Sequence, residues 1–175
     1  MNFRKLSPEV FVADSTIVAV GDSDIDFLKE CARKNPRKRA RICAHINNDD
    51  SLHEMIIAIT SNSYIQPHKH NGKSESFHVI DGYLDVLIFD ECGEITKLIE
   101  LGNIGSGKCS FYRLSESLYH TIIIRSETVV FHEVTNGPFS SVDTQKAPFA
   151  PDEENLDDVL IYKSKLMEKI ANFKR

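Results

Sequence analysis

The sequence has few cysteines and no close pair among them. The thiols belong to Cys31, Cys43, Cys92 and Cys109, so no Cys-x-x-Cys spacing is present. The absence of that spacing argues against a zinc knuckle and against a redox-active pair. A chain of 175 residues buries a sizeable core without covalent staples. We therefore expect all of its thiols to be reduced.

Long apolar runs are absent as well. No stretch approaches the ~20 residues that span a bilayer. The chain begins MNFRKLSP, which lacks the apolar segment of a secretory signal. These two absences predict a soluble, cytoplasmic protein with no membrane partner.

An excess of positive charge is the third missing feature. Lys and Arg number 21 against 26 Asp and Glu, for a net charge of -5, which argues against a nucleic-acid partner. Several of the basic residues cluster between residues 33 and 41. We interpret this cluster as a solvated loop that leads into a strand. The alternative is that Arg39 or Arg41 enters the mouth of the fold and binds a substrate carboxylate or phosphate, which Arg recognises with paired hydrogen bonds.

The chain begins with a segment that we predict to be an N-terminal strand and helix extension, residues 1–36, packing on the main domain. It contains two β-branched apolar runs, at 9–12 and 16–20, that read as strands. A helix pattern follows. Asp22–Ser23 supplies its N-cap and Asn35–Pro36 ends it.

Residues 37–150 show short apolar runs separated by turn residues. These runs predict the strands of an antiparallel sandwich or barrel; they cover residues 40–46, 54–60, 75–80, 83–89, 95–101, 109–114, 119–125 and 128–135. Residues 151–175 carry apolar side chains at helical spacing, with acidic residues first and basic residues last. We predict a C-terminal helix that packs on its own barrel or on the second subunit of a homodimer.

The most informative stretch is YIQPHKHNGKSE, which contains two histidines. On a strand, residues two apart point to the same face, so His68 and His70 project together. Asn71–Gly72 turns the chain, and Glu75 then opens the next strand beside them. Two imidazoles and one carboxylate from adjacent strands are three ligands of a divalent-metal site. The alternative is a pair of surface histidines beside a hairpin.

His120 is the fourth candidate ligand. It lies in LYHTIII, an apolar run in which a polar ring needs an explanation. The alternative is a core histidine that is hydrogen-bonded to the backbone, but the three-ligand site favours the ligand interpretation. Such a ligand set does not choose among zinc, iron, manganese and nickel, because affinity order and availability dominate.

These residues resemble the motifs of the cupin family. The spacing His68-x-His70, four residues to Glu75 and six more to Gly82 matches the first cupin motif, and His120 falls where the second motif carries its metal histidine. The second motif departs from the family at Cys109, Ser115, Ser117 and Ile124. The resemblance implies a mainly β, jelly-roll-type β-barrel that holds one divalent metal ion through His68, His70, Glu75 and His120.

A closer resemblance is to the bacterial WbuC-type cupin-fold metalloproteins, over roughly residues 35–155. It rests on the stretches NPRKRARICAH, HEM, YIQPHKH, EVTNGPF and APFAPDEE. That family is associated with surface-polysaccharide gene clusters. The resemblance therefore implies a bacterial protein of polysaccharide biosynthesis and leaves the reaction open.

Other polar residues lie near the site in the predicted strands. His45 and His53 flank a turn and are either pocket residues or hydrogen-bonded loop histidines. His78 alternates with Glu75 along its strand, so we expect it to face away from the metal. We place Glu133 in the pocket as a carboxylate near the metal.

Two function classes follow. The first is a metal-dependent enzyme, an isomerase, hydrolase or oxygenase, that acts on a small polar substrate such as a sugar or sugar nucleotide. In that class Glu133 or His45 is the acid/base group, and the substrate contacts are Arg39, Arg41 and His53. The second is a non-catalytic, metal-dependent module that binds or senses a small ligand.

Overall fold

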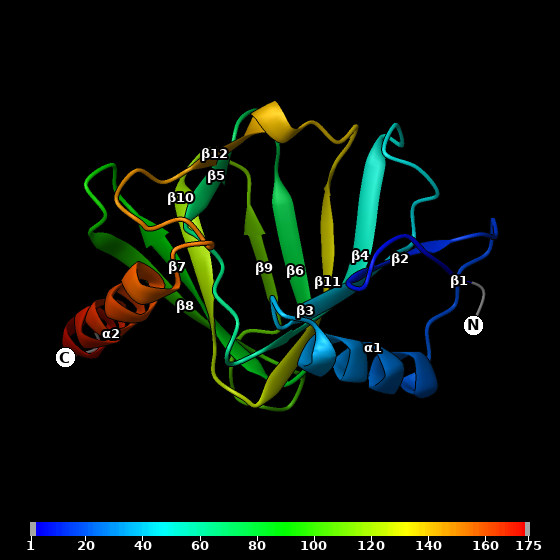
Figure 1. Cartoon of the computed structure of the whole chain (residues 1–175), viewed down its shortest axis with the longest axis horizontal. Coiled ribbons are helices and arrows are strands. Elements are labelled where there is room, and N and C mark those ends of the chain that lie inside the picture. Colours follow the sequence, from blue (N-terminus) through cyan, green and yellow to red (C-terminus); the bar gives the residue numbers. More distant parts are fainter. Residues whose placement is uncertain (1–2, 174–175) are drawn as a thin grey trace.

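The computed structural model describes residues 3–173 and is mainly β, with two sheets that face each other and a helix against each sheet (Figure 1). The predicted segments 1–36 and 151–175 include residues 1–2 and 174–175, which lie outside the described residues. In chain order the elements are β1 (Phe3–Lys5), β2 (Val10–Ala13), α1 (Asp22–Lys34), β3 (Arg39–Cys43), β4 (Leu52–Thr60), β5 (His68–His70), β6 (Glu75–Asp81), β7 (Tyr83–Phe89), β8 (Ile95–Gly102), β9 (Phe111–Leu114), β10 (Tyr119–Ile124), β11 (Thr128–Asn136), the 3-10 helix η1 (Ser141–Asp143), β12 (Thr144–Lys146) and α2 (Leu156–Phe173).

The strand order is that of a jelly roll. One sheet runs β1-β2-β3-β4-β11-β6-β9 and the other β12-β5-β10-β7-β8. Within them, β4-β11-β6-β9 faces β5-β10-β7-β8, and neighbours in each set are antiparallel. The predicted fold class is confirmed with one correction. Among the described residues, no strand of one sheet pairs along its length with a strand of the other, so the expected closed barrel is an open sandwich. At the edge where closure would occur, β3, β2 and β1 extend the first sheet instead.

The predicted runs coincide with β3, β4 and β6 to β11 to within a few residues. The strand predicted at residues 16–20 is wrong, because this segment has no strand conformation and Ile17 is 83% exposed. β-Branched residues favour strands only where a neighbouring strand and a buried face are available. All four cysteines are free, as expected.

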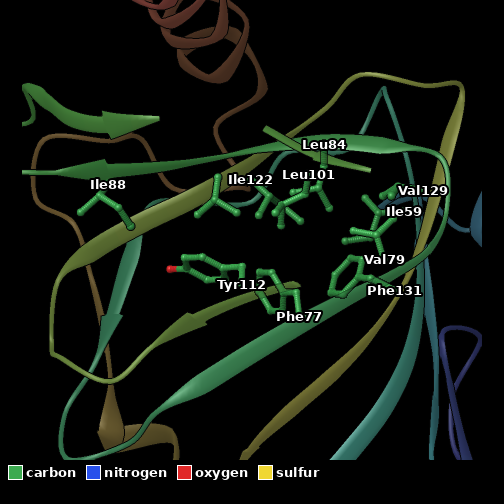
Figure 2. Packing of buried hydrophobic residues seen from close by; sticks show 11 residues of the cluster. Ile59, Phe77, Val79, Leu84, Ile88, Leu101, Tyr112, Ile122, Val129 and Phe131 are labelled. Atoms are coloured by element: carbon green, nitrogen blue, oxygen red, sulfur yellow. The ribbon is translucent and has the colours of Figure 1, made fainter. Parts of the chain in front are cut away.

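The main apolar core lies between the two sheets (Figure 2). Side chains that alternate along each strand point inward, as expected for half-buried strands. The first sheet contributes Ile59, Phe77, Val79, Tyr112, Val129 and Phe131, and the second contributes Leu84, Val86, Ile88, Leu101 and Ile122. Burying each large apolar side chain contributes about 1.5–3 kcal/mol, so this cluster holds the sheets together below the site described next.

The two helices cover the outer faces of the sheets. Helix α1 buries Leu28 and Ala32 against β3 and β4, and it ends at Asn35 as predicted. Its N-cap is Gly21 rather than Asp22–Ser23, because the Asp24 carboxylate accepts a hydrogen bond from the Gly21 N–H. Helix α2 packs on the second sheet through Leu166 and Ile170. Neither helix of the described chain is long and apolar enough to cross a membrane.

The turn between β6 and β7 depends on a glycine. Gly82 has φ +82°, and a Cβ there would lie 2.5 Å from both Ser126 Oγ and the Thr128 carbonyl oxygen. Because strain and crowding add, we expect Gly82→Ala to lower the free energy of unfolding by at least about 3 kcal/mol. Gly105→Ala is the matched control, since Gly105 has φ +88° with nothing within 4 Å of its Cβ position, and about 1–2 kcal/mol is expected. Urea denaturation measures both; equal losses would contradict the crowding argument.

Candidate metal centre

Three histidines converge at the open end of the sandwich. His68 and His70 point to one side of β5, and β10 pairs with β5 so that His120 lies directly opposite His68. The ligating nitrogens of the three rings lie within 4.8 Å of one another. The Asn71–Gly72 turn, with Gly72 at φ +70°, then leads to β6 in the facing sheet. The prediction that Glu75 opens the strand beside His68 and His70 is wrong, because β6 lies in the facing sheet. The alternation along β5 and its pairing with β10 bring the rings together.

Each ring is oriented through its Nδ1 atom. Nδ1 of His68 lies 2.8 Å from the Gln66 carbonyl oxygen, and Nδ1 of His120 lies 2.9 Å from that of Leu118. Because a carbonyl only accepts, these Nδ1 atoms carry the proton and donate it. The Nε2 atoms are then left with lone pairs. This is the usual arrangement of metal-binding histidines.

His70 is oriented by a side chain from β12, the strand beside β5 (Figure 1). Its Nδ1 lies 3.1 Å from Thr144 Oγ1, and a hydroxyl both donates and accepts. Thr144 was missed by the sequence analysis, because the three-residue strand that carries it has no apolar pattern. Only the pairing of β12 with β5 reveals the contact.

Glu75 completes the cluster from the facing sheet. It is 4% exposed, with Oε1 3.0 Å from His120 Nε2 and Oε2 3.4 Å from His70 Nε2. Within the described residues, Glu75 Oε1 and His120 Nε2 are buried and have no hydrogen-bond partner other than each other. Two buried acceptors that face each other need a cation or a shared proton between them. The donor set therefore fits a divalent metal.

The pKa shifts of the cluster residues are also compatible with metal binding. Burial lowers the pKa of His68 to about 4, with a further contribution from His120, so that its ring is neutral at pH 7. Burial alone would raise the pKa of Glu75, but His120 and His70 outweigh it and hold the pKa below its usual range. For His120, burial is likewise outweighed by Glu75, which raises its pKa. A metal that binds here displaces the proton of that pair.

The histidines line a cavity of about 760 Å³ between the sheets. The lining of this cavity includes every residue that the sequence analysis proposed for the site. They are Arg39, Arg41, His45, His53, His68, His70, Glu75, His120 and Glu133. His78, in contrast, is exposed on the opposite face of β6, as expected. The roles proposed for the residues other than the histidine cluster stay predictions.

Glu133 lies on the cavity wall next to the cluster. On β11, Thr135 is the partner of Glu75, so Glu133 is its diagonal neighbour, a separation that long side chains bridge. Burial, together with the charge of Glu75, raises the pKa of Glu133 to about 8. A protonated carboxyl group at neutral pH both donates and accepts hydrogen bonds.

His45 and His53 form a stacked pair on the far wall. Their ring centroids are 4.0 Å apart and their planes differ by 13°. Nδ1 of His45 lies 3.2 Å from the Glu54 carbonyl oxygen, and Nε2 of His53 lies 3.2 Å from that of Asn48. Both alternatives from the sequence therefore hold at once, since each ring is hydrogen-bonded to a loop or strand carbonyl and also faces the cavity. Burial, with the charge of His53, lowers the pKa of His45.

The two candidate arginines differ in their partners. Arg39 is mostly buried, and its Nη2 donates to both carboxylate oxygens of Glu153, at 3.1 and 3.0 Å. Glu153 also accepts hydrogen bonds from Arg37. Arg41 is exposed, and no carboxylate of the described chain forms an ion pair with it. Glu153 belongs to the APFAPDEE stretch, so the family resemblance was the available signal for this contact.

Comparison with known proteins supports the fold but assigns no family. A family model described as a domain of unknown function, DUF6016, matches residues 20–101, less than half of the chain. No curated protein matches the sequence.

Several solved structures are similar in fold. Protein SO0799 from Shewanella oneidensis has a TM-score of 0.50 at 10% identity, over 72% of this chain and 78% of that one. Oxalate decarboxylase from Bacillus subtilis has a TM-score of 0.45 at 22% identity. The match covers 56% of this chain and 24% of the decarboxylase chain, so this chain spans about a quarter of that protein. The cupin domain of Schizosaccharomyces pombe Cnp3 has 0.44 at 11%, over 57% and 64%.

At these identities the likeness concerns the fold, and no activity carries over. The neighbours include cupin proteins, and this chain brings three histidines together at the mouth of a jelly roll. The histidine cluster is a feature of this chain itself and marks a candidate metal site.

We expect His70→Ala to weaken divalent-metal binding by at least about 100-fold, because it removes one of three converging nitrogens. His78→Ala is the control, since this ring lies on the exposed face of β6. Elemental analysis of protein purified without added metal, followed by zinc titration, measures the effect, and circular dichroism checks the fold. Unchanged metal content in the His70 variant would show that the ligand assignment is wrong.

Proposed function

We propose that this protein is a metal-dependent enzyme that acts on a small polar substrate, a sugar or sugar nucleotide, in bacterial surface-polysaccharide metabolism. The observation that carries the proposal is the buried pair of Glu75 Oε1 and His120 Nε2, 3.0 Å apart, beside two further imidazoles. The resemblance to WbuC-type proteins supports the polysaccharide role and the bacterial, cytoplasmic setting.

The ligands of the metal in this proposal are His68, His70, Glu75 and His120. When bound, the ion polarises a substrate carbonyl or hydroxyl, and it is zinc, iron, manganese or nickel. Four protein ligands leave positions open on a metal that prefers five or six. The cavity beside them supports access of a substrate to those positions.

Glu133 is the proposed acid/base group, with His45 as the second candidate. Glu133 lies diagonally across from Glu75, and its raised pKa of about 8 keeps a proton available near neutral pH. The walls of the cavity also include the apolar side chains of Met55 and Ile122. His53, Arg41 and Arg39 contact the substrate in this proposal, although Arg39 does so only if its pair with Glu153 opens.

An open coordination position is directly testable. We expect azide to change the visible spectrum of the cobalt-substituted protein, because an exogenous ligand replaces water on the metal. Spectra of wild type and of the His70→Ala variant, recorded during azide titration, make the comparison. A cobalt spectrum that is insensitive to azide would leave a closed, structural metal.

The catalytic assignment predicts a separable effect of Glu133. Glu133→Gln keeps the shape of the side chain and removes its proton transfer, so we expect metal content to be retained and kcat to fall by about 100-fold or more. NMR assays of the metal-loaded protein with a panel of sugar phosphates and sugar nucleotides provide the rates. Binding without turnover by the wild type would favour the non-catalytic module over the enzyme.

A further inference from the structure

The cavity extends well beyond the metal ligands. Across the first sheet, His53 pairs with Thr135, and Thr135 pairs with Glu75. Because neighbouring strands lie ~4.8 Å apart, the backbone of His53 is roughly 10 Å from that of Glu75. Both ends line the same cavity of about 760 Å³. A ligand bound only at the metal would not contact the far wall.

The far wall offers hydrogen-bond acceptors. His45 is 9% exposed and His53 is 5% exposed. Each ring donates one N–H to a backbone carbonyl, from His45 Nδ1 and from His53 Nε2. In a neutral imidazole the other nitrogen then carries a lone pair. A cavity wall with two such nitrogens favours a ligand with hydroxyl groups that donate to them.

The same wall carries a cation. Arg39, Arg41 and His45 are alternate residues on the cavity side of β3 and its extension, and all three line the cavity. The charge of Arg39 is already neutralised by Glu153. Arg41 has no ion-pair partner within residues 3–173, so its guanidinium group is available to an anion. Arg4 also lines the cavity, but its strand β1 lies two strands beyond β3.

We infer that the ligand of this cavity is a hydroxylated anion, such as a sugar phosphate or sugar acid, with its anionic group on Arg41 and its hydroxyl groups on His45 and His53. This inference rests on the proposed function for the opposite end of the ligand, which reaches the metal. A cavity of about 760 Å³ has room for a phosphorylated or carboxylated hexose. While Arg39 is paired with Glu153, it holds the segment that contains Glu153.

The test uses the full chain with His70→Ala, which separates the anion subsite from the metal. The probes are inorganic phosphate, glucose 6-phosphate and gluconate, titrated by NMR and calorimetry. We expect saturable phosphate binding in this background. Addition of Arg41→Gln should raise the Kd at least about tenfold, because a charge-assisted hydrogen bond is lost. The matched control Arg33→Gln, on helix α1 and outside the cavity lining, should change it less than about threefold.

The hydroxyl contacts have their own readout. Glucose 6-phosphate should bind about tenfold more tightly than inorganic phosphate, and His45→Ala should remove most of that difference. Gluconate in place of glucose 6-phosphate distinguishes a carboxylate ligand from a phosphate ligand. Arg41→Lys, which keeps the charge without paired hydrogen bonds, should give an intermediate Kd and replaces Arg41→Gln if that variant does not fold.

The outcomes separate the two proposals. Equal losses in the two arginine variants, a larger loss in Arg4→Gln, or no saturable binding of any probe would overturn the anion subsite and leave the metal site standing. Absence of metal from the wild-type protein, with phosphate binding that depends on Arg41, would overturn the proposed enzyme and leave the subsite.

Discussion

A buried carboxylate that faces an imidazole nitrogen constrains this end of the molecule. Glu75 and His120 come from different sheets, and both are almost completely buried. Removing a charged carboxylate from water costs several kcal/mol unless a cation compensates it. The pairing of β5 with β10 brings the rings together, and the Nδ1 hydrogen bonds orient them for binding a cation. A sandwich closed at this end by apolar side chains would need none of them.

The strands that form the site also form the core. Along β6, inward-facing residues change from Glu75 to Phe77 and Val79, and along β10 they change from His120 to Ile122. The same alternation therefore places polar side chains at the mouth and apolar side chains at depth. The apolar layer shown in Figure 2 fixes the separation of the sheets directly below the histidines. The position of the site is thus set by the point along β6 and β10 at which the inward-facing residues change from polar to apolar.

Local patterns carried most of the predictable information. The period of two in His68-x-His70 predicted two converging rings that the structure forms, because strand alternation acts over a few residues. The Asn71–Gly72 turn was expected to lead to the neighbouring strand, but it leads to the facing sheet. The 16–20 strand failed because its apolar pattern had no partner strand. Contacts to Thr144 and Glu153 were not predictable from composition or periodicity, because each depends on chain segments more than 70 residues away. The open sandwich was not predictable for the same reason, because it depends on the pairing of β2 with β3, two segments that are distant in the sequence.

A purely structural metal would not account for the surroundings of the cluster. Structural sites are closed and need only their ligands and the groups that orient them. Here the cluster opens onto a cavity whose walls carry a carboxyl group on β11, two stacked imidazoles and an arginine without an ion-pair partner among the described residues. These groups lie along one sheet, on the side that faces the metal ligands, and a ligand that contacts them together explains this arrangement.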